Sequence, residues 1–329
     1  MESTRSKLIH VLSINDGNFI SGQEISDLLQ ISRSAIWKHM KELEKDGYVI
    51  EAKRNKGYRI IKSPSKVSEN TVQWGLETNW LGKSILHKET INSTQLLAHQ
   101  LAMDNAPHGT VVIADEQTAG KGRLQREWYS KKNKGIWMSI ILRPTILPYL
   151  APQLTLLTAT VLADVMKKEL ELDPKIKWPN DIILHDRKVS GILTEMQAEQ
   201  DQIQYIVIGI GMNVNHDDGE IPDDIQSKAT SLMIESGKEW DITKLIQRIF
   251  VAFEKSYAEY INHGFSIIKK RWESYGYRLG EKVQLKTFQS VQDAILTGIA
   301  EDGALLAKYD DGVIHKIYSG EIDWFGIRH

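Results

Sequence analysis

A glycine-containing loop, Gly120–Arg126, carries three cationic side chains within seven residues. It follows an apolar run that ends near Gln117 and that we expect to be a strand. Because Gly120 and Gly122 have no side chain, the backbone can approach a ligand closely, and its amide hydrogens can point at an anion. Trp128 follows within stacking reach. The loop therefore predicts a site for a carboxylate or phosphate, although an ordinary exposed basic loop would have the same composition.

A second stretch, Lys177–Asp181 followed by Arg187–Leu193, combines a lysine, a carboxylate and a glycine. Lys188 begins an apolar strand that leads into Gly191, so its cation could meet an anion where the glycine allows close approach. Asp181 has the type of oxygen ligand that Mg²⁺ prefers, or it could pair with an arginine. The simpler interpretations are a solvated lysine at a hairpin end and an aspartate that caps a turn.

Several common catalytic and nucleotide-binding motifs are absent. Gly82-Lys83-Ser84 ends like a P-loop, but Glu77 stands where the first glycine is required. Gly209-Ile210-Gly211 lacks the third glycine of a dinucleotide-binding fingerprint. The chain has no Gly-x-Ser-x-Gly, no His-Glu-x-x-His and no cysteine. These absences exclude disulfides and thiolate chemistry, and they argue against a serine nucleophile elbow and a zincin helix.

The first 62 residues have the pattern of three helices followed by a hairpin with a basic turn. They contain 11 Lys and Arg residues against 8 Asp and Glu residues, a net charge of +3 that suits a polyanionic partner. The order resembles a winged helix-turn-helix, in which the second motif helix enters the major groove and wing cations contact phosphates. A small protein-interaction module is the alternative. The predicted DNA contacts are Ser32, Arg33, Ser34, Lys38 and His39 on the helix, and Lys53, Arg54 and Lys56 on the wing.

The middle of the chain alternates helices with runs of adjacent strands. Ser93 begins a helix that runs to about Met103, and a long apolar helix covers 152–171. Strands are expected over 110–115, 135–142, 175–178, 182–185, 188–198 and 204–214. Adjacent strands joined by turns favour a mixed sheet with helices on one face over a doubly wound parallel sheet.

The tail changes to short strands separated by Glu301-Asp302-Gly303 and Asp310-Asp311-Gly312. Asp-Gly between alternating apolar runs is a strong hairpin signal. With a polar linker over 62–66, the expected domains are 1–65, 66–275 and 276–329. The sequence thus predicts a multi-domain α/β protein with an N-terminal winged helix-turn-helix, a central mixed-sheet α/β domain and a C-terminal SH3-like β-barrel.

The composition is that of a folded multi-domain protein, since the 329 residues are 41% hydrophobic and 26% charged. The longest uncharged apolar run, Tyr205–Val214, is about half as long as a bilayer requires. The N-terminus has no apolar core of secretory length. We therefore expect no membrane segment and a cytoplasmic location.

The motifs, taken in order, carry a resemblance to a known family. Gly-Lys-Gly-Arg-x-x-Arg-x-Trp is followed by Lys-Trp-Pro-Asn-Asp, Arg-Lys-x-x-Gly-Ile-Leu and Gly-Ile-Gly-Met-Asn-Val-Asn. This order resembles the biotin protein ligases. With the winged helix, the chain is similar to the bifunctional members that also repress biotin genes. The resemblance covers nearly the whole chain, with its motifs between Ser93 and Asn215.

The resemblance implies a two-step reaction in the central, ligase domain. Biotin and ATP give biotinyl-5′-AMP and pyrophosphate, and the biotin then passes to a lysine of a biotin carboxyl carrier domain. ATP and biotin are substrates, Mg²⁺ is expected with them, and no tightly bound prosthetic group is implied. The first step joins two anions, so cations must neutralise and align them, and no covalent nucleophile is needed.

The resemblance also implies roles for individual residues. The catalytic group is Lys188, Arg123 and Asp181, with Asp181 as the candidate Mg²⁺ ligand. The residues implied to bind biotin are Ser93, Thr94, Gln95, Gln117, Gly120, Lys121, Gly122, Arg123, Trp137, Lys188, Gly191 and Ile192, with Trp137 and Ile192 as apolar walls. The residues implied to bind ATP or the adenylate are Arg123, Arg126, Trp128, Asn180, Lys188 and Asn213.

Two residues of the loop depart from the family pattern. Lys121 stands where arginine is common and loses the bidentate geometry of a guanidinium. Gln125 stands where glycine is common, which bears on the loop's closed conformation. In the family that the chain resembles, the adenylate orders this loop and promotes a homodimer that binds operator DNA, so we expect biotinyl-5′-AMP to be both intermediate and corepressor.

Two other functions remain open from the sequence. A lipoate- or octanoyl-transferring enzyme would share the central fold but would not need the winged helix. A non-catalytic transcription regulator that senses a small molecule would keep the winged helix but would not turn over ATP.

Overall fold

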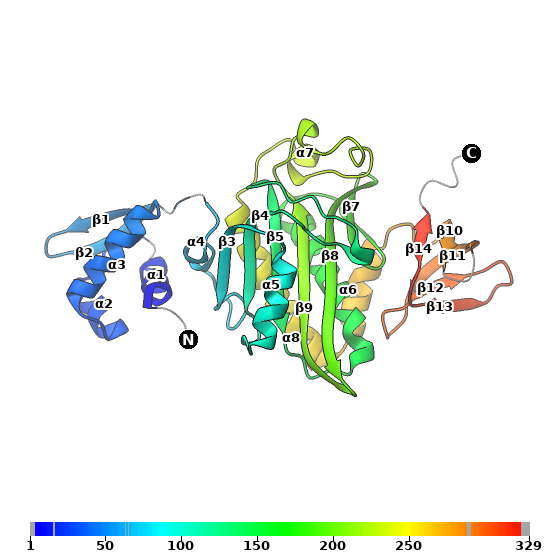
Figure 1. The fold of residues 1–329 in the computed structure, drawn as a ribbon, viewed down its shortest axis with the longest axis horizontal. Coiled ribbons are helices and arrows are strands. Elements are labelled where there is room, and N and C mark those ends of the chain that lie inside the picture. The colour runs from blue at the N-terminus through cyan, green and yellow to red at the C-terminus, as the bar shows by residue number, and fades with distance from the viewer. Residues whose placement is uncertain (1–3, 16, 63, 65, 288–290, 324–329) are drawn as a thin grey trace.

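The computed structural model describes residues 4–15, 17–62, 64, 66–287 and 291–323 and forms three lobes along its long axis (Figure 1). The first lobe consists of α1 (Thr4–Ile14), α2 (Gly22–Leu29), α3 (Arg33–Lys45), β1 (Val49–Lys53) and β2 (Gly57–Lys62). The hydroxyls of Ser21 and Ser32 accept hydrogen bonds from the first turns of α2 and α3, which fixes where these helices begin. Apolar residues of all three helices and the hairpin meet in one cluster. The predicted winged helix-turn-helix is confirmed.

The second lobe is built on a seven-stranded sheet. Its strands are β3 (Ile85–Ile91), β4 (Val111–Gln117), β5 (Gly135–Leu142), β6 (Lys175–Lys177), β7 (Asp181–Leu184), β8 (Arg187–Glu199) and β9 (Gln202–Asn213). Their order is β3-β4-β5-β9-β8-β7-β6. Only the β3–β4 pair of this sheet is parallel, and the other neighbours are antiparallel. The predicted mixed sheet is therefore confirmed.

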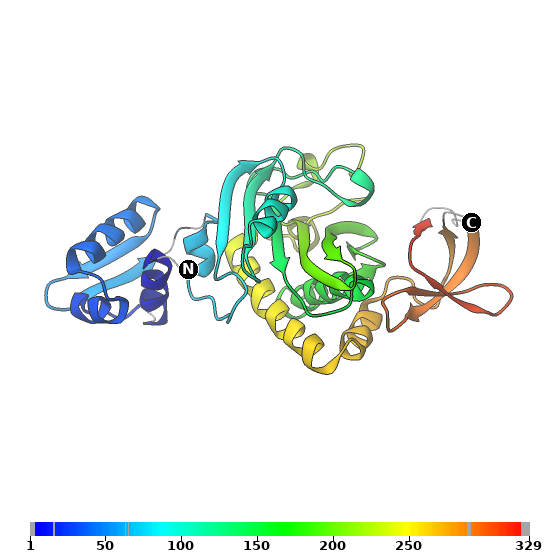
Figure 2. The same ribbon diagram turned by 60° about the horizontal axis from the view of Figure 1, so that its bottom comes forward.

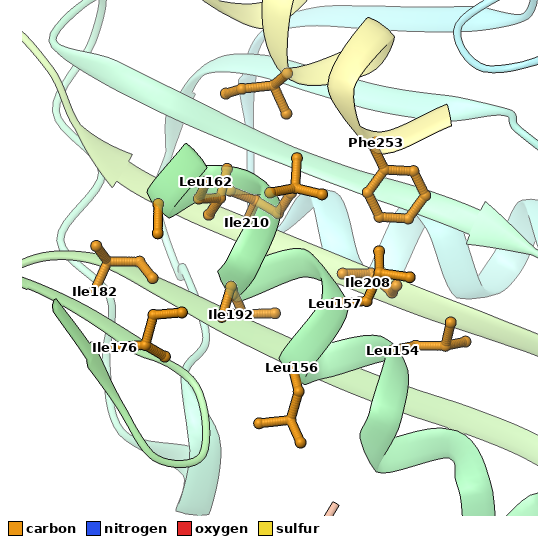
Figure 3. Packing of buried hydrophobic residues seen from close by; sticks show 14 of the residues in the cluster. Leu154, Leu156, Leu157, Leu162, Ile176, Ile182, Ile192, Ile208, Ile210 and Phe253 are labelled. Atoms are coloured by element: carbon orange, nitrogen blue, oxygen red, sulfur yellow. The ribbon is translucent and has the colours of Figure 1, made fainter. Parts of the chain in front are cut away.

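Helices cover both faces of this sheet, and the expectation of helices on one face is wrong. Val112, Ile141 and Val207 pack against α5 (Thr94–Met103). Their strand neighbours, such as Ile140 and Ile208, point the other way and pack with α6 (Ala151–Glu169) and α8 (Ile242–His263). Figure 2 shows helices on both sides of the sheet, and Figure 3 shows Ile208 beside Leu157 and Phe253. All eight residues of β5 are buried, so each face of the sheet requires cover.

The sequence did not predict β3. Only Ile85 of this strand is buried, and its centre, Lys88–Thr90, is exposed. An edge strand needs few apolar residues, so it lacks the alternation by which strands are recognised.

The helix α6 with its preceding turn, Pro148–Glu169, is long and apolar enough to cross a membrane by length and composition, so the expectation that Tyr205–Val214 is the longest uncharged apolar run is wrong. However, 78% of its most apolar window is buried inside the fold. Leu154, Leu157 and Leu162 face the sheet residues in Figure 3. The helix is therefore the central core helix of this lobe.

The third lobe follows α9 (Ser266–Tyr275). Its strands are β10 (Lys282–Lys286), β11 (Val291–Ile299), β12 (Leu305–Lys308), β13 (Ile314–Ile317) and β14 (Glu321–Asp323), in the order β13-β12-β11-β10-β14. All pairs are antiparallel, as the Asp-Gly turns predict. Val283, Leu296 and Leu305 belong to the same apolar cluster as the second lobe. The fold thus changes near residue 276 from the mixed α/β lobe to an antiparallel sheet, but one apolar cluster includes residues on both sides of that boundary.

Candidate active site

The site lies where two neighbouring strands present glycines to each other. Gly191 on β8 is the direct cross-strand partner of Gly211 on β9. This pair belongs to one row across the sheet, with Trp137 on β5 at one side and Asp181 on β7 at the other. A Cβ on Gly211 would lie 2.5 Å from the Trp128 ring, and one on Gly191 would lie 2.9 Å from it. The two glycines therefore leave a flat surface on the sheet that the Trp128 ring covers. We call the surface formed by Gly191 and Gly211 the glycine floor.

Charged side chains meet at one edge of the glycine floor. The Nζ atom of Lys188 lies 2.8 Å from Oδ1 of Asp181 and 4.9 Å from the centre of the Trp128 ring. Arg123 donates a hydrogen bond of 3.1 Å to Oδ1 of Asn180. Two cations from distant segments thus converge on one place, which is an arrangement that can neutralise two anions at once.

The loop 120–126 contains a short 3₁₀ turn over Arg123–Gln125. Leu124 and Gln125 have φ angles of 55° and 59°, in the left-handed region that favours glycine. Lys121 and Arg126 are exposed, while Arg123 turns inward to Asn180. The structure therefore brings Arg123 to the floor and leaves the two other cations of the loop at its outer side.

A polar network lines the other edge of the floor. The amide and the hydroxyl of Thr94 donate to Oε1 of Gln117 at 2.8 and 3.0 Å. The hydroxyl of Ser139 bridges Thr94 and the buried Gln95, at 2.9 and 3.1 Å. The hydroxyl of Ser93 is buried without a hydrogen-bond partner among the described residues. Because such a group is costly unless a ligand or water satisfies it, Ser93 points to a bound polar molecule.

Trp137 and Ile192, the two residues predicted as apolar walls, lie on opposite faces of the sheet. Trp137 is fully buried on the site's side of the sheet, and its indole N–H donates to the Lys131 carbonyl at 3.2 Å. The side chain of Ile192 points to the opposite face, where it packs beside Leu156 and Leu157 (Figure 3). The prediction of Ile192 as a wall is therefore wrong, because successive strand residues alternate faces and Gly191 occupies the site's face.

The backbone of Ile192 has a different role. Its N–H donates to the Asn180 carbonyl at 2.9 Å, and its carbonyl accepts from Nδ2 of Asn180 at 2.8 Å. Asn180 is thus fixed to β8 on one side and accepts from Arg123 on the other.

Glu235 is a buried carboxylate that the sequence did not predict as part of the site. It binds the side chains of Arg187 and Thr230, which are neighbours of Lys188. Glu235, on α7 (Leu232–Ser236), accepts hydrogen bonds from Arg187 and Thr230 and pairs with His185. Burial acts to raise the pKa of Glu235, but Thr230, His185 and Arg187 together hold it below its usual value. No sequence motif marks this residue, because its charged partners Arg187 and His185 lie 48 and 50 residues away along the chain.

The segment that Glu235 fixes is bonded to β8, the strand that carries Lys188. The Lys188 amide donates to the Lys228 carbonyl at 2.7 Å, and the Thr230 amide donates to the Lys188 carbonyl at 2.9 Å. Asn213 donates to the Thr230 carbonyl at 2.9 Å. The backbone of Lys188 and the side chain of Asn213 are therefore held by the same short segment.

Among the described residues, no three His, Asp or Glu side chains gather as a metal site. Asp181, the carboxylate on the floor's row, is paired with Lys188. Mg²⁺ in nucleotide sites is commonly held by one or two carboxylates together with substrate phosphates. A single aspartate therefore fits a cation that arrives with a nucleotide and does not fit a dedicated metal cage.

The first lobe presents the predicted DNA-binding side chains on its surface. Ser32, Arg33, Ser34 and Lys38 are exposed at the start of α3, while His39 is half-buried with Nδ1 3.4 Å from Oε2 of Glu42. On the wing, Lys53 pairs with Glu51 at 3.0 Å, whereas Arg54 and Lys56 are exposed. Trp37, which was not among the predicted DNA contacts, is 56% exposed on α3.

Comparisons with known proteins find a matching family model for each of the three lobes. Residues 87–213 match the family model described as Biotin/lipoate A/B protein ligase family, residues 4–59 match an HTH domain, and residues 279–324 match the Biotin protein ligase C terminal domain. Two proteins named bifunctional ligase/repressor BirA, from Bacillus spizizenii and Bacillus subtilis, are 47% and 46% identical to the chain over 324 residues. Each alignment covers 98% of this chain and 99% of the relative.

A solved structure of the biotin protein ligase from Aquifex aeolicus, in complex with biotin and ATP, is 32% identical with a TM-score of 0.65. The match covers 73% of this chain and 98% of that chain.

Proposed function

Since the chain belongs to the bifunctional biotin protein ligases that are also transcriptional repressors, we propose that biotin and ATP are joined over its glycine floor. The protein is a ligase and a repressor. The observation that carries the proposed site is the convergence of Lys188 and Arg123 beside the Gly191–Gly211 pair.

In the first half-reaction, a carboxylate oxygen of biotin attacks the α-phosphorus of ATP. A new P–O bond forms, the bond to the pyrophosphate oxygen breaks, and biotinyl-5′-AMP remains. Lys188 and Arg123 would neutralise the two approaching anions and stabilise the charge that builds up on the α-phosphate. Asp181, 2.8 Å from Lys188, would orient the ammonium group.

In the second half-reaction, the amine of an acceptor lysine attacks the carbonyl of the biotinyl group. An amide bond forms, the acyl–oxygen bond breaks, AMP leaves with the electron pair, and the proton that the amine loses passes to solvent. Lys188 would stabilise the phosphate of the leaving AMP. Neither step needs a covalent nucleophile on the enzyme, in agreement with the absence of cysteine.

The polar network at Thr94 and Gln117 is the proposed site for the ureido ring of biotin. It offers amide and hydroxyl groups that include both hydrogen-bond donors and acceptors, and the buried hydroxyl of Ser93 lacks a partner among the described residues. Gly120 and Gly191 would allow the ligand to approach the backbone. Trp137 would close the apolar side of this pocket, because its ring is buried on the same face.

The nucleotide would extend toward Asn180 and Asn213, with Trp128 and Arg126 contacting it from the loop. Asp181 would hold Mg²⁺ that arrives with ATP and that supplies additional positive charge at the phosphates. The acceptor is a biotin carboxyl carrier domain, and we place the protein in the cytoplasm, where ATP and this acceptor occur together.

The winged helix would bind operator DNA through α3 and the wing. We propose that biotinyl-5′-AMP promotes a homodimer, because a two-fold symmetric protein matches an operator with two half-sites. Sedimentation with and without biotin and ATP tests this, and an unchanged mass would contradict it.

The enzymatic proposal is tested by incubating the protein with biotin, ATP, Mg²⁺ and a carrier domain, followed by mass spectrometry of the carrier. The expected result is the mass of one biotinyl group on one lysine. Competition with lipoate and octanoate separates a biotin-specific site from the related acyl-transferring activities, since neither acid has a ureido ring for Thr94 and Gln117 to bind.

A further inference from the structure

The tail contacts the second lobe through the turn between β11 and β12, residues 300–304. Gly303 has a φ of +86°, and a Cβ there would lie 3.1 Å from Leu156 of α6. Ala304 and Leu305 are 2% and 0% exposed. The Gly303–Ala304 side of the turn is therefore packed against the second lobe, while Glu301 remains exposed.

Two hydrogen bonds from buried side chains hold this turn. Nε2 of Gln153 donates to the Glu301 carbonyl at 2.6 Å, and the indole N–H of Trp178 donates to the Gly303 carbonyl at 3.2 Å. Gln153 is itself fixed by the hydroxyl of Tyr260, which donates to it at 2.6 Å. Gln153 and Trp178 are 4% and 7% exposed. The carbonyls of Glu301 and Gly303 are thus each paired with a donor that is anchored in the second lobe.

Trp178 lies two residues before Asn180, whose position decides where Arg123 is held. The Asn180 amide donates to the Lys177 carbonyl at 3.1 Å, so the chain makes a tight turn at this point. Asn180 is bonded on both sides to Ile192 and accepts from Arg123 at 3.1 Å. A shift of the Trp178 ring would therefore move the acceptor that orients Arg123.

We infer that the 300–304 turn of the tail positions Arg123 for adenylate formation through Trp178 and Asn180, an inference that rests on the proposed function. Trp178 is a positioning residue in this account, because it contacts the tail and not the substrates. The tail then contributes to the first half-reaction without touching ATP or biotin. The same Lys-Trp-Pro-Asn-Asp motif contains the site residues Asn180 and Asp181. Its tryptophan, Trp178, connects the motif to the tail through the hydrogen bond to Gly303.

The test replaces Trp178 by phenylalanine in the full-length protein, which removes the N–H and keeps an aromatic ring. The matched control is Trp272→Phe, because the Trp272 indole is also buried, at 1% exposure, but its N–H has no hydrogen-bond partner among the described residues. Both variants lose the same atoms from the same apolar cluster. Each half-reaction is measured separately, with pyrophosphate release for the first and transfer from supplied biotinyl-5′-AMP for the second.

The expected result is a fall in kcat for pyrophosphate release of between about 10- and 100-fold in Trp178→Phe, the size produced by misplacing a catalytic group by about 1 Å. The KM for biotin should change little, because the ureido network lies at the other edge of the floor. Trp178→Phe should melt below Trp272→Phe, because only Trp178→Phe loses a hydrogen bond. The kcat values are therefore compared well below both melting temperatures, where Trp272→Phe should keep the wild-type kcat.

Equal kcat in Trp178→Phe and wild type would overturn the inference, and so would equal losses in both variants. A loss confined to the transfer step would also overturn it, because the tail would then act on the acceptor. If Trp178→Phe does not fold, Gln153→Met provides the test, since it removes the second bond to the turn and should lower kcat in the same half-reaction. A wild-type protein that releases no pyrophosphate would contradict the proposed function itself, which distinguishes the two failures.

Discussion

Among individual residues, Lys188 is the side chain on which the proposed formation of biotinyl-5′-AMP depends most. Its ammonium group is held between Asp181 and the Trp128 ring, at 2.8 Å from the carboxylate and 4.9 Å from the ring centre. The backbone of the same residue is bonded on both sides to the segment 228–230. Side chain and backbone are therefore both oriented before a ligand binds, which is the condition for electrostatic stabilisation of a transition state.

Replacing Lys188 by alanine is expected to lower the rate of adenylate formation by about 10²–10³-fold, the range found when one preorganised charge-stabilising group is removed. The measurement is pyrophosphate release at saturating biotin and ATP. Lys167→Ala is the control, since Lys167 also lies 2.8 Å from an aspartate, Asp173, but on an exposed helix end. Comparable rates in the two variants would remove Lys188 from the mechanism.

Gln125 offers a test of the loop that does not alter a ligand contact, because its side chain is exposed while its φ is 59°. A β-branched residue is strained in this region and glycine is not. Gln125→Val should therefore raise the KM for biotin several-fold, from strain on the order of 1 kcal/mol, whereas Gln125→Gly should not. Equal KM values in the two variants would show that the loop does not keep this backbone in the working enzyme.

The individual residues of the site were predictable to different degrees. The cationic loop and Lys188 were found because glycines and cations sit together in the sequence. Ile192 was misplaced although a strict two-residue period puts it opposite Gly191. Ser139 and Glu235 were missed because their partners, Thr94 and Arg187, lie 45 and 48 residues away.

At the element scale, Glu254 connects the long helix α8 to the segment before β3. Its carboxylate accepts from the backbone amides of Asn79, Trp80 and Leu81 at 2.6, 2.9 and 3.0 Å. Burial acts to raise the pKa of Glu254, but these amides together with the Asn79 side chain hold it below its usual value. The charged form is thus favoured in the folded protein.

Glu254→Gln should lower the free energy of unfolding by about 2 kcal/mol, because hydrogen bonds to a charged group contribute about 1.5–3 kcal/mol. Because the folded pKa is lowered, this contribution is complete above the unfolded value of 4.5 and is lost as the pH falls through the folded pKa. Urea unfolding at pH 7 and at pH 3.5 measures both effects, with the exposed Glu169→Gln as control. A variant difference that does not shrink at the lower pH would contradict the explanation.

The elements themselves followed the sequence where periodicity was strong. The three N-terminal helices and the tail hairpins were predicted in the correct order, and the strands β5, β8 and β9 were predicted within a few residues. The polar edge strand β3 was not, because nothing in its residues distinguishes it from a loop. The two-sided cover of the sheet was also missed, since which helix packs on which face depends on connections between distant segments.

At the scale of the whole molecule, the chain places a DNA-binding lobe at one end and a β-rich tail at the other, with the catalytic sheet between them (Figure 1). The tail shares the apolar cluster of the second lobe, whereas the first lobe has a cluster of its own. This difference agrees with a DNA-binding lobe that acts as a separate unit and a tail that acts together with the catalytic lobe.

The wing gives a graded test of DNA binding. Arg54→Ala and Lys56→Ala should each weaken operator binding and reduce the slope of log affinity against log salt by about 1. Lys53→Ala should have the smaller effect, because Lys53 already pairs with Glu51 and lies 5.3 Å from the centre of the Phe19 ring. Fluorescence anisotropy at several salt concentrations is the measurement, and equal effects of all three substitutions would contradict the assignment of phosphate contacts.

The most direct test of the central claim is biotin-dependent release of pyrophosphate from ATP by the purified chain. The account predicts a burst of about one pyrophosphate per active site without acceptor, since the adenylate stays bound, and continuous turnover once a carrier domain is added. The burst should be about 10²–10³-fold slower in Lys188→Ala. No release by the wild-type chain, or a burst of wild-type rate in that variant, would contradict the claim that cations over the glycine floor join biotin to ATP.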